Sequence, residues 1–226
     1  MKVLVVGGSS GIGIATVKTF VNANHEVIAT YRTNIPEGGE GAYWLKADML
    51  SVADIESIAA NISTIDLLIL LPGVSLGKNL SQYLDEEMEE VIAVNFTSQF
   101  RTIQRVRHCL AADSQIIFLG SIAGQRGSAD PVYGASKGAV HALAKSLAKS
   151  MAPRTRVNVI APGMVTDTGM YDATDPDVIK GHLETSPTGH FVSAEEISKI
   201  ILDMSLPHWR QLNGACIDLN GGQYLR

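Results

Sequence analysis

The chain has 226 residues, of which 46% are apolar and 18% charged, and its formal net charge is −5. This composition excludes an intrinsically disordered chain, and no lysine- or arginine-rich run indicates nucleic acid or an anionic membrane as a partner. The longest unbroken apolar runs, such as Leu67–Leu71, are far shorter than the ~18 residues of a membrane-spanning helix, which excludes insertion into a bilayer.

Short apolar segments rich in β-branched residues alternate along the chain with longer amphipathic segments. Several of the apolar segments contain almost no polar residues, which is typical of strands covered on both faces. The expected strands are Lys2–Val6, Glu26–Thr30, Ala42–Lys46, Leu67–Leu71, Gln115–Leu119, Arg156–Ala161 and Cys216–Leu219, and the expected helices are 11–23, 51–61, 84–111, 133–151 and 193–204. Because parallel strands need crossover connections, this alternation predicts an α/β fold: a doubly wound parallel sheet of about seven strands with helices on both faces.

The length allows one domain or two small ones, at ~100–200 residues per domain. No linker, repeat or low-complexity tract divides the chain, so we expect a single domain. One stretch, 164–192, is rich in Thr, Asp, Gly and Pro and contains a possible short helix near Pro176–Leu183. A long irregular segment in a compact domain is usually functional or mobile. It is a candidate substrate lid, the alternative being a tolerated surface excursion.

The cysteines and histidines indicate neither a disulfide framework nor a metal site. Cys109 and Cys216 form no CxxC pair, and the six histidines show no HExxH spacing. The N-terminal residues lack the long apolar stretch and cleavage site of a secretory signal. We therefore expect a cytoplasmic protein without a bound metal.

A glycine-rich turn directly follows the first expected strand. Its glycines, Gly7, Gly11 and Gly13, permit a tight turn and let the backbone approach a pyrophosphate at the start of a helix. The GxxxGxG spacing differs from the GxGxxG of most dinucleotide-binding domains, and a turn that serves only packing is the alternative. Its position after the first strand favours cofactor binding.

The residues after the second expected strand bear on the choice of cofactor. An acidic residue there would select NAD, but this chain has Tyr31 and Arg32. A guanidinium offers a fork of donors that can pair with a 2′-phosphate, although Arg32 can also be an ordinary surface residue. The absence of a carboxylate favours NADP(H) over NAD(H).

Tyr133 and Lys137 open the helix expected after the fifth strand, twelve residues beyond Ser121. At positions i and i+4 they share one helix face. A lysine ammonium beside a phenol is expected to lower the phenol pKa, so that Tyr133 can exchange a proton with a carbonyl or carbinol oxygen. A serine hydroxyl on a neighbouring loop can hydrogen-bond to the same oxygen. Tyr-x-x-x-Lys alone is common by chance, and its significance comes from the motifs around it.

Motifs spread over nearly the whole chain occur in a fixed order. They are Val-Gly-Gly-Ser-Ser-Gly-Ile-Gly at 6–13, Asp48 in Lys-Ala-Asp-Met, Asn95 in Ala-Val-Asn-Phe, Leu-Gly-Ser-Ile-Ala-Gly at 119–124, Tyr-Gly-Ala-Ser-Lys at 133–137, Asn-Val-Ile-Ala-Pro-Gly at 158–163 and Asp-Leu-Asn-Gly-Gly at 218–222. The set resembles the short-chain dehydrogenase/reductase family, most of all single-domain members such as the 3-oxoacyl carrier-protein reductases. The resemblance implies a Rossmann-like NAD(P)-binding domain over 1–226 that interconverts a carbonyl and a secondary alcohol, and a homodimer or homotetramer.

The resemblance also implies roles for individual residues. Tyr133 is the acid/base, Ser121 orients the substrate carbonyl, and Lys137 tunes Tyr133 and binds the nicotinamide ribose. Asn95 helps to hold a water that links Lys137 to solvent. The expected cofactor-binding residues are Gly7, Ser9, Ser10, Gly11, Ile12, Gly13, Arg32, Asp48, Met49, Gly73, Tyr133, Lys137, Pro162, Gly163, Val165 and Thr166, with Thr168 as the alternative to Thr166.

The chain departs from the family pattern in two places. Leu70-Leu71-Pro72-Gly73 stands where the family has Asn-Asn-Ala-Gly, and Val6 replaces a threonine of the glycine loop. These departures leave open a dinucleotide-binding regulatory or scaffold protein that has lost catalysis. A nucleotide-sugar epimerase or dehydratase is a third possibility, but such enzymes carry a C-terminal substrate domain. The leading hypothesis is an NADP(H)-dependent oxidoreductase acting on a small carbonyl or alcohol.

Overall fold

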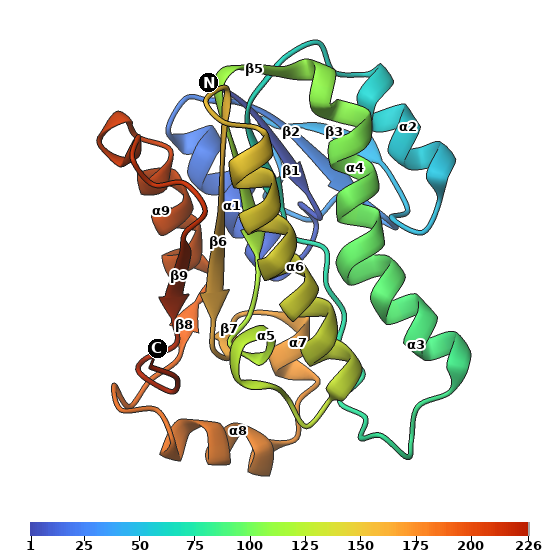
Figure 1. Ribbon diagram of the computed structural model, residues 1–226, viewed down its shortest axis with the longest axis vertical. Helices are drawn as coiled ribbons and strands as arrows, with labels where there is room; N and C mark the ends of the chain where they lie inside the picture. Colours follow the sequence, from blue (N-terminus) through green and yellow to red (C-terminus); the bar gives the residue numbers. More distant parts are fainter. Residues whose placement is uncertain (226) are drawn as a thin grey trace.

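A seven-stranded sheet in which every strand is parallel to its neighbours forms the framework of the computed structural model, which describes residues 1–225 (Figure 1). Its strand order is β3-β2-β1-β4-β5-β6-β9. The strands are β1 (Lys2–Val6), β2 (Glu26–Tyr31), β3 (Tyr43–Lys46), β4 (Ile65–Leu70), β5 (Leu110–Leu119), β6 (Thr155–Pro162) and β9 (Cys216–Leu219). All seven correspond to predicted strands, and the doubly wound α/β fold is confirmed.

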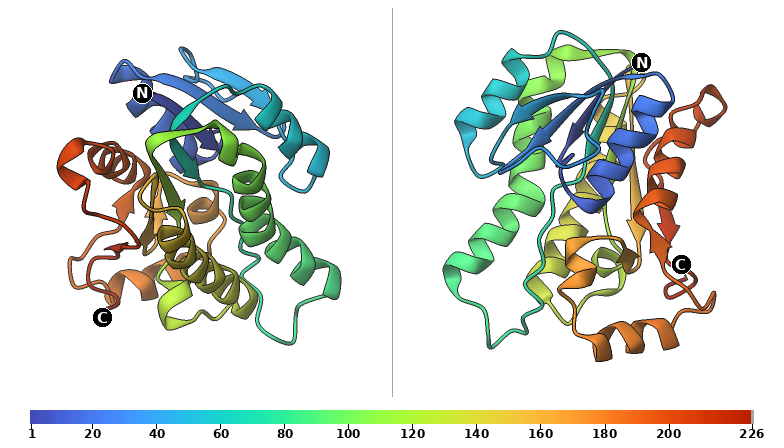
Figure 2. Two further views of the ribbon diagram at one scale, coloured as in Figure 1. Left: turned by 45° about the horizontal axis from the view of Figure 1, so that its top comes forward. Right: turned by 180° about the vertical axis from the view of Figure 1, so that it is seen from behind.

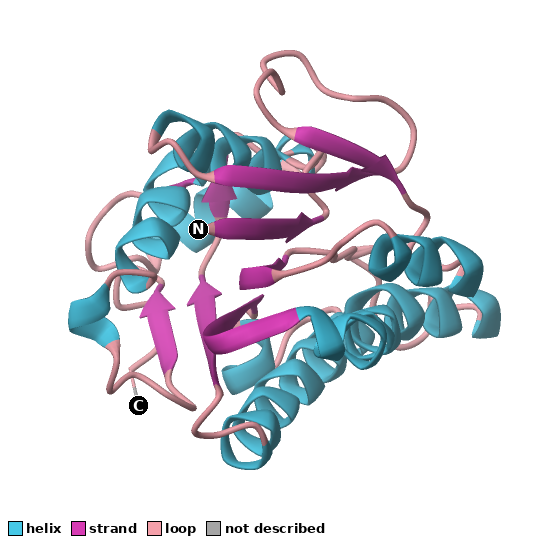
Figure 3. Ribbon diagram, turned by 90° about the horizontal axis from the view of Figure 1, so that it is seen from above, coloured by secondary structure: helices cyan, strands magenta, loops and turns pink. Residues whose placement is uncertain are grey.

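Helices cover both faces of the sheet, as Figures 2 and 3 show. On one face lie α1 (Gly11–Asn22) and α9 (Ala194–Met204), and on the other α2 (Val52–Ala60), α4 (Ser98–Val106) and α6 (Pro131–Ser150). The alternation along β1 explains this arrangement: Val3 and Val5 pack with α1 and α9, whereas Leu4 and Val6 pack with the other layer. A strand covered twice needs apolar residues at every position.

The strand order reverses between β1 and β4. From β1 the chain first builds β2 and β3 on one side, then crosses over to β4, β5 and β6 on the other. Connections leave the carboxyl ends of β1 and β4 in opposite directions, which opens a crevice at that edge of the sheet. Ligands of doubly wound sheets bind at this position, so the residues that follow the strands are the candidate ligand-binding residues.

The prediction of one continuous helix over 84–111 is wrong. The structure has α3 (Asp85–Ile92), a π-helical turn at Ala93–Thr97 and then α4. A 3₁₀ turn at Arg107–Cys109 follows, and β5 already begins at Leu110, which pairs with Ile65. π-helical turns insert an extra residue into a helix and are frequent at functional sites; this one contains Asn95.

The segment 164–192 is more ordered than its composition suggests. It contains β7 (Val165–Thr166), α7 (Gly169–Asp172), α8 (Pro176–Glu184) and β8 (Val192–Ser193), and β7 pairs with β8 in a separate parallel sheet. α8 corresponds to the short helix expected near Pro176–Leu183. Figure 1 shows these elements beyond the carboxyl ends of the strands. The short helix α5 (Ala123–Arg126), which follows β5, packs against α6. Helix caps that are local in sequence, such as the Thr168 hydroxyl on the Tyr171 N–H, order the segment.

Within the described residues 1–225, no helix combines the length and the apolar character that crossing a membrane requires.

Gly13 is the point where α1 approaches the glycine loop most closely. A Cβ added there would lie 2.2 Å from the Gly7 carbonyl oxygen. We expect Gly13→Ala to destabilise the protein by about 1–3 kcal/mol, the usual cost of overpacking, as measured by urea unfolding. The control is Gly181→Ala in α8, where a Cβ meets nothing within 4 Å and the gain in helix propensity is about 0.5–1 kcal/mol. Equal effects of the two substitutions would contradict the close approach.

Candidate active site

The turn between β1 and α1 lies at the carboxyl edge of the sheet. Ser10 caps α1, since its hydroxyl accepts the Gly13 N–H at 3.0 Å and donates to the Gly7 carbonyl at 2.8 Å. The Gly7 N–H donates to the Thr30 hydroxyl at 2.9 Å, so β2 supplies a side-chain hydrogen bond that Val6 cannot make. The first N–H groups of α1 have no partner within the helix, as an anion-binding helix start requires. The predicted residues Gly7, Ser9, Ser10, Gly11, Ile12 and Gly13 all lie in this turn or the first turn of α1.

The residues predicted on the adenosine side follow β2 and β3 at the same edge. Arg32 is exposed and forms no ion pair or side-chain hydrogen bond with any residue that the structure describes. The Asp48 carboxylate accepts the Leu50 N–H at 2.9 Å, and the Asp48 N–H donates to Asp54 at 2.7 Å, which fixes the turn that carries Met49. An unpaired guanidinium beside a glycine-rich helix start fits a phosphate-bearing dinucleotide.

The unusual segment 70–73 keeps the bonding of the sheet. The Leu71 N–H donates to the Val6 carbonyl at 3.1 Å, and the buried Gln99 amide donates to the Pro72 carbonyl at 2.9 Å. Pro72 therefore stands just beyond the last ladder bond of β4, where a missing N–H costs nothing. The two departures that raised the possibility of a silent protein are thus accommodated.

Ser121 and Tyr133 come from different elements and meet at this edge. Ser121 follows β5 and is buried; its N–H donates to His141 Nε2 at 3.4 Å, and its hydroxyl accepts the Ala123 N–H at 3.1 Å. Tyr133 lies in the first turn of α6, and its phenol is hydrogen-bonded to the Ser121 side chain. The role of His141, which holds the backbone of Ser121, was not anticipated from the sequence.

The electrostatic setting of Tyr133 differs from the prediction. Burial raises the pKa of the Tyr133 phenol, the Asp130 carboxylate raises it further, and only the hydrogen bond with Ser121 acts in the opposite direction. The expected lowering by Lys137 is therefore wrong for this structure. A phenol with a raised pKa is protonated at neutral pH, so the Tyr133 hydroxyl is able to donate a proton in a hydrogen bond.

Lys137 lies one turn further along α6 and is only 2% exposed. Its Nζ donates to the Leu119 carbonyl at 2.9 Å and stands 5.9 Å from the centre of the Tyr133 ring. No carboxylate pairs with it among residues 1–225, and burial lowers its pKa to about 8. A Cβ added at Gly73 would lie 3.1 Å from this Nζ, so Gly73 gives Lys137 its space.

Asn95 reaches the same region from the π-helical turn. Its Oδ1 accepts the Val74 N–H at 2.8 Å, and its Nδ2 donates to the Val74 carbonyl and to the Ser136 hydroxyl, both at 2.9 Å. The Gln99 amide in turn donates to the Asn95 carbonyl at 2.7 Å. The side-chain amide of Asn95 thus ties the loop after β4 to α6.

Asp130 is a residue of the site that the sequence interpretation missed. It caps α6 directly before Pro131, is 4% exposed, and fastens the loop 74–83 to the start of the helix. Burial alone would raise its pKa, but hydrogen bonds outweigh burial and hold the pKa of this carboxyl below its usual value. The donors are the Tyr83 and Ser75 hydroxyls at 2.6 and 2.9 Å and the N–H groups of Leu76, Gly77 and Tyr133 at 3.2, 3.1 and 3.0 Å. The signal was available, because Asp followed by Pro is a typical helix start.

Asp130→Asn is expected to destabilise the protein by about 2–3 kcal/mol at neutral pH, since the amide turns a donor toward buried donors. The wild type should lose this advantage as the pH falls through the depressed pKa of Asp130, below about 4. Urea unfolding at several pH values measures both effects. Asp175→Asn is the matched control, because Asp175 also caps a helix before proline but is exposed and bonds only locally. A similar loss in both variants would attribute the effect to capping alone.

The predicted residues after β6 lie at the same carboxyl edge of the sheet. Gly163 follows β6, where its N–H donates to the Leu219 carbonyl of β9 at 3.0 Å. The Thr166 hydroxyl donates to the neighbouring Asp167 at 3.2 Å, whereas Thr168 lies against the glycine loop. A Cβ added at Gly11 would meet the Asp167 carbonyl oxygen at 2.4 Å and the Thr168 Cα at 2.9 Å. Of the two threonines, Thr168 is the one packed on the glycine loop. Pro162 and Val165 flank Gly163 at the ends of β6 and β7.

The sequence also matches an established family. The family described as short chain dehydrogenase matches residues 1–178. The chain belongs to the short-chain dehydrogenase family. Members of this family are NAD(P)-dependent oxidoreductases, so this short-chain dehydrogenase is an enzyme of that class.

Two relatives illustrate how far this likeness extends. The 3-oxoacyl-(acyl-carrier-protein) reductase FabG of Salmonella typhimurium is 30% identical over 236 aligned positions, covering 98% of this short-chain dehydrogenase and 96% of the relative. The reductase MabA of Mycobacterium bovis is 27% identical, with 98% and 92% covered.

Solved structures show the same fold. A dehydrogenase/reductase from Sinorhizobium meliloti superposes with a TM-score of 0.91 at 26% identity, covering 99% of this short-chain dehydrogenase and 95% of the other chain. RhlG of Pseudomonas aeruginosa, solved as an active-site complex with NADP, superposes with a TM-score of 0.89 at 28% identity, with 99% and 96% covered.

Proposed function

We propose that the protein transfers a hydride between NADP(H) and a small carbonyl or secondary alcohol, with Tyr133 as the acid/base. The observation that carries this proposal is the meeting of Ser121, Tyr133 and Lys137 at the carboxyl edge of the sheet, beside the glycine loop. A dinucleotide-binding module needs no half-buried phenol beside a buried ammonium. The relatives named as 3-oxoacyl-(acyl-carrier-protein) reductases support reduction of a carbonyl.

The cofactor fits the residues of the crevice. The start of α1 and the glycine loop would hold the pyrophosphate, Arg32 the adenosine side, and Lys137 and the residues after β6 the nicotinamide side. When bound, the cofactor supplies the hydride. The protein contributes orientation and electrostatics to the transfer.

The proton transfer follows from the state of the three side chains. Tyr133, held protonated by burial, donates its proton to the carbonyl oxygen, which the Ser121 hydroxyl orients. The ammonium of Lys137 then stabilises the phenolate that remains. In the direction of carbonyl reduction, the raised pKa keeps Tyr133 protonated before the transfer. Lys137 stabilises the Tyr133 phenolate that forms after it.

The segment 164–192 is proposed to cover the substrate in this single-domain protein. It lies beyond the carboxyl ends of the strands, and Asp167 and Thr168 anchor it on Gly11. Its exposed Met170 and half-buried Tyr171 offer apolar contacts to a substrate. Specificity then depends on this segment and on the loop 74–83 that Asp130 holds.

A substrate panel tests the proposed function. Binding of NADPH and NADH is first measured by fluorescence, and NADPH oxidation is then followed with carbonyl compounds, beginning with 3-oxoacyl thioesters. We expect oxidation with at least one class of carbonyl. Tight cofactor binding with no oxidation over a broad panel would instead favour the silent dinucleotide-binding protein.

Arg32 is expected to set the preference for NADPH. A charge-assisted hydrogen bond is worth about 1.5–3 kcal/mol, so Arg32→Ala should raise the Kd for NADPH about 10- to 100-fold and leave the Kd for NADH nearly unchanged. Arg154→Ala, at another exposed arginine of the same charge, is the control. An equal loss for both cofactors in Arg32→Ala would remove the assignment of a 2′-phosphate contact.

A further inference from the structure

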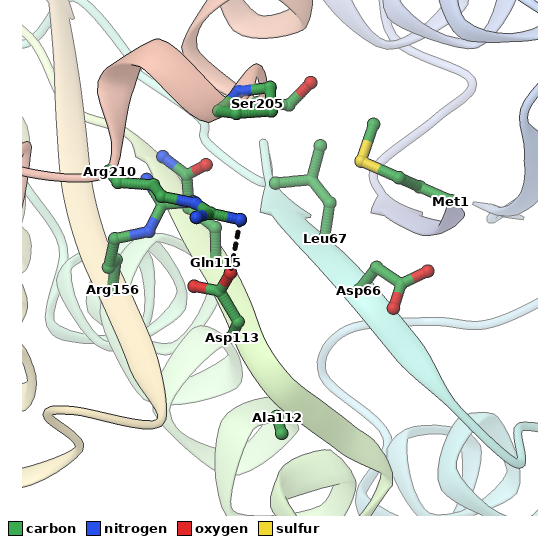
Figure 4. A pocket seen from close by; sticks show the side chains of 10 residues that line it. Met1, Asp66, Leu67, Ala112, Asp113, Gln115, Arg156, Ser205 and Arg210 are labelled. Atoms are coloured by element: carbon green, nitrogen blue, oxygen red, sulfur yellow. Dashed lines mark ion pairs between the residues drawn. The ribbon is translucent and has the colours of Figure 1, made fainter.

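A pocket lies at the opposite edge of the sheet from the candidate active site. It has a volume of about 370 Å³ and lies at the amino-terminal ends of β4, β5 and β6, beneath the segment that follows α9 (Figure 4). We call it the amino-edge pocket and define it by Asp66, Asp113, Gln115, Arg156, Ser205 and Arg210. Its size is within the usual range for sites that take small ligands.

Three of the five buried side-chain polar atoms that lack a hydrogen-bond partner in residues 1–225 belong to this pocket. They are Nε2 and Oε1 of Gln115 and Nε of Arg156. Gln115 is only 2% exposed, so both ends of its amide are withdrawn from solvent without compensation. Such groups are rare in native proteins, because each costs free energy unless it finds a partner. Their concentration at one pocket indicates that a partner belongs there.

The charges of the pocket select the kind of partner. Arg156 has no carboxylate partner among the described residues, and its only side-chain hydrogen bond that is seen runs from Nη1 to the Trp209 carbonyl at 3.2 Å. Both carboxylates are already engaged: Asp66 accepts the Lys2 N–H at 2.7 Å, and Asp113 lies 3.7 Å from Arg210. Of the three polar atoms of the pocket that lack a hydrogen-bond partner, two are therefore donors, Gln115 Nε2 and the guanidinium Nε of Arg156.

We propose that the amino-edge pocket binds a small molecule through its carboxylate or phosphate group, held by Arg156 and Gln115. The oxyanion accepts hydrogen bonds from Arg156 Nε and Gln115 Nε2, and Gln115 Oε1 accepts from a hydroxyl of the same molecule. Arg210 lines the same pocket and stays paired with Asp113, so that this carboxylate does not face the anion unpaired. This site does not depend on the proposed oxidoreductase function.

The two sites are separate. Gln115, which lines the amino-edge pocket, lies in the middle of β5 (Leu110–Leu119); the strand ends at Leu119, and Ser121 follows two residues later. Six residues of extended chain span about 20 Å, at ~3.3 Å per residue. A small ligand in the amino-edge pocket therefore cannot touch Ser121 or Tyr133.

Two variants and a matched control test the site by binding alone. Inorganic phosphate and succinate are the probes, titrated by calorimetry against the full chain at constant ionic strength. We expect saturable binding of at least one probe, weakened at least tenfold by Arg156→Met and by Gln115→Met. Arg154→Met removes the same charge two residues away and should change the affinity less than twofold. Binding of phosphate alone assigns a phosphate ligand, and binding of succinate alone a carboxylate.

Gln115→Met adds a readout that does not depend on the choice of probe. Because methionine has a similar shape and no polar atoms, the variant should melt at a higher temperature than the wild type without ligand. No saturable binding of either probe, or equal weakening by Arg154→Met, would overturn the proposal. A lower melting temperature of ligand-free Gln115→Met would also overturn it, since Gln115 would then serve the fold.

Discussion

Replacing Tyr133 by phenylalanine is expected to lower kcat about 10²–10⁴-fold, the usual contribution of a positioned acid/base. The substitution removes only the hydroxyl, whose protein partner is Ser121. The ring, its place in α6 and the nearby Lys137 remain. The Kd for NADPH should therefore stay within about threefold of the wild type, while turnover falls. Steady-state kinetics and cofactor titration on the same preparation separate the two quantities.

Tyr43→Phe is the matched control for this variant. Tyr43 lies in β3, is 60% exposed and is distant in sequence and in the sheet from α6. Its loss of a hydroxyl should leave kcat unchanged. Undiminished turnover in Tyr133→Phe would remove Tyr133 from the mechanism.

Lys137→Met is expected to stabilise the protein and to impair it as an enzyme. The side chain is 2% exposed, and its pKa is lowered from 10.5 to about 8, so holding it charged below pH 8 costs about 3 kcal/mol. Methionine loses the hydrogen bond to the Leu119 carbonyl, worth about 1 kcal/mol. The variant should therefore be about 2 kcal/mol more stable at pH 7, with turnover reduced about 10²-fold or more.

The pH dependence of this difference gives a sharper test. In the wild type, the unfolded chain binds more protons than the folded one between about pH 8 and 10.5, so wild-type stability rises with pH in that window. The advantage of Lys137→Met should shrink over the same window. Lys145→Met, at an exposed position of the same helix, should change stability by less than about 0.5 kcal/mol at every pH. A destabilised Lys137→Met would show that the ammonium supports the fold.

Much of the fold could be predicted because its signals are local. The strands that are covered on both faces are apolar at nearly every position. Ser10 and Ser193 are serines at helix N-caps, a position that serine favours. The motifs also predicted that Ser121, Tyr133 and Lys137 lie together, and the structure places them near one another. Their catalytic roles stay a prediction. The prediction of one helix over 84–111 was wrong because the π-helical turn contains Asn95, whose side chain is hydrogen-bonded to Val74 and Ser136. Both residues are distant from Asn95 in sequence.

The direction of the Tyr133 pKa could not be predicted for a similar reason. Spacing places Tyr133 and Lys137 on one helix face, but it does not show that the ammonium is turned to the Leu119 carbonyl. Nor does it show that burial outweighs the hydrogen bond with Ser121. Both facts depend on how β5 packs against α6, which is a property of the folded chain.

The contact of Asp167 and Thr168 with Gly11 has a kinetic consequence. Asp167 and Thr168 begin the segment proposed to cover the substrate, and they lie against Gly11 in the loop proposed to bind the cofactor. The dinucleotide and the substrate would therefore both have to pass this segment to reach the site. We expect a compulsory order of addition, in which the dinucleotide enters first and leaves last. The opening of this contact would then govern the release of the spent dinucleotide, and with it the rate of turnover on a good substrate.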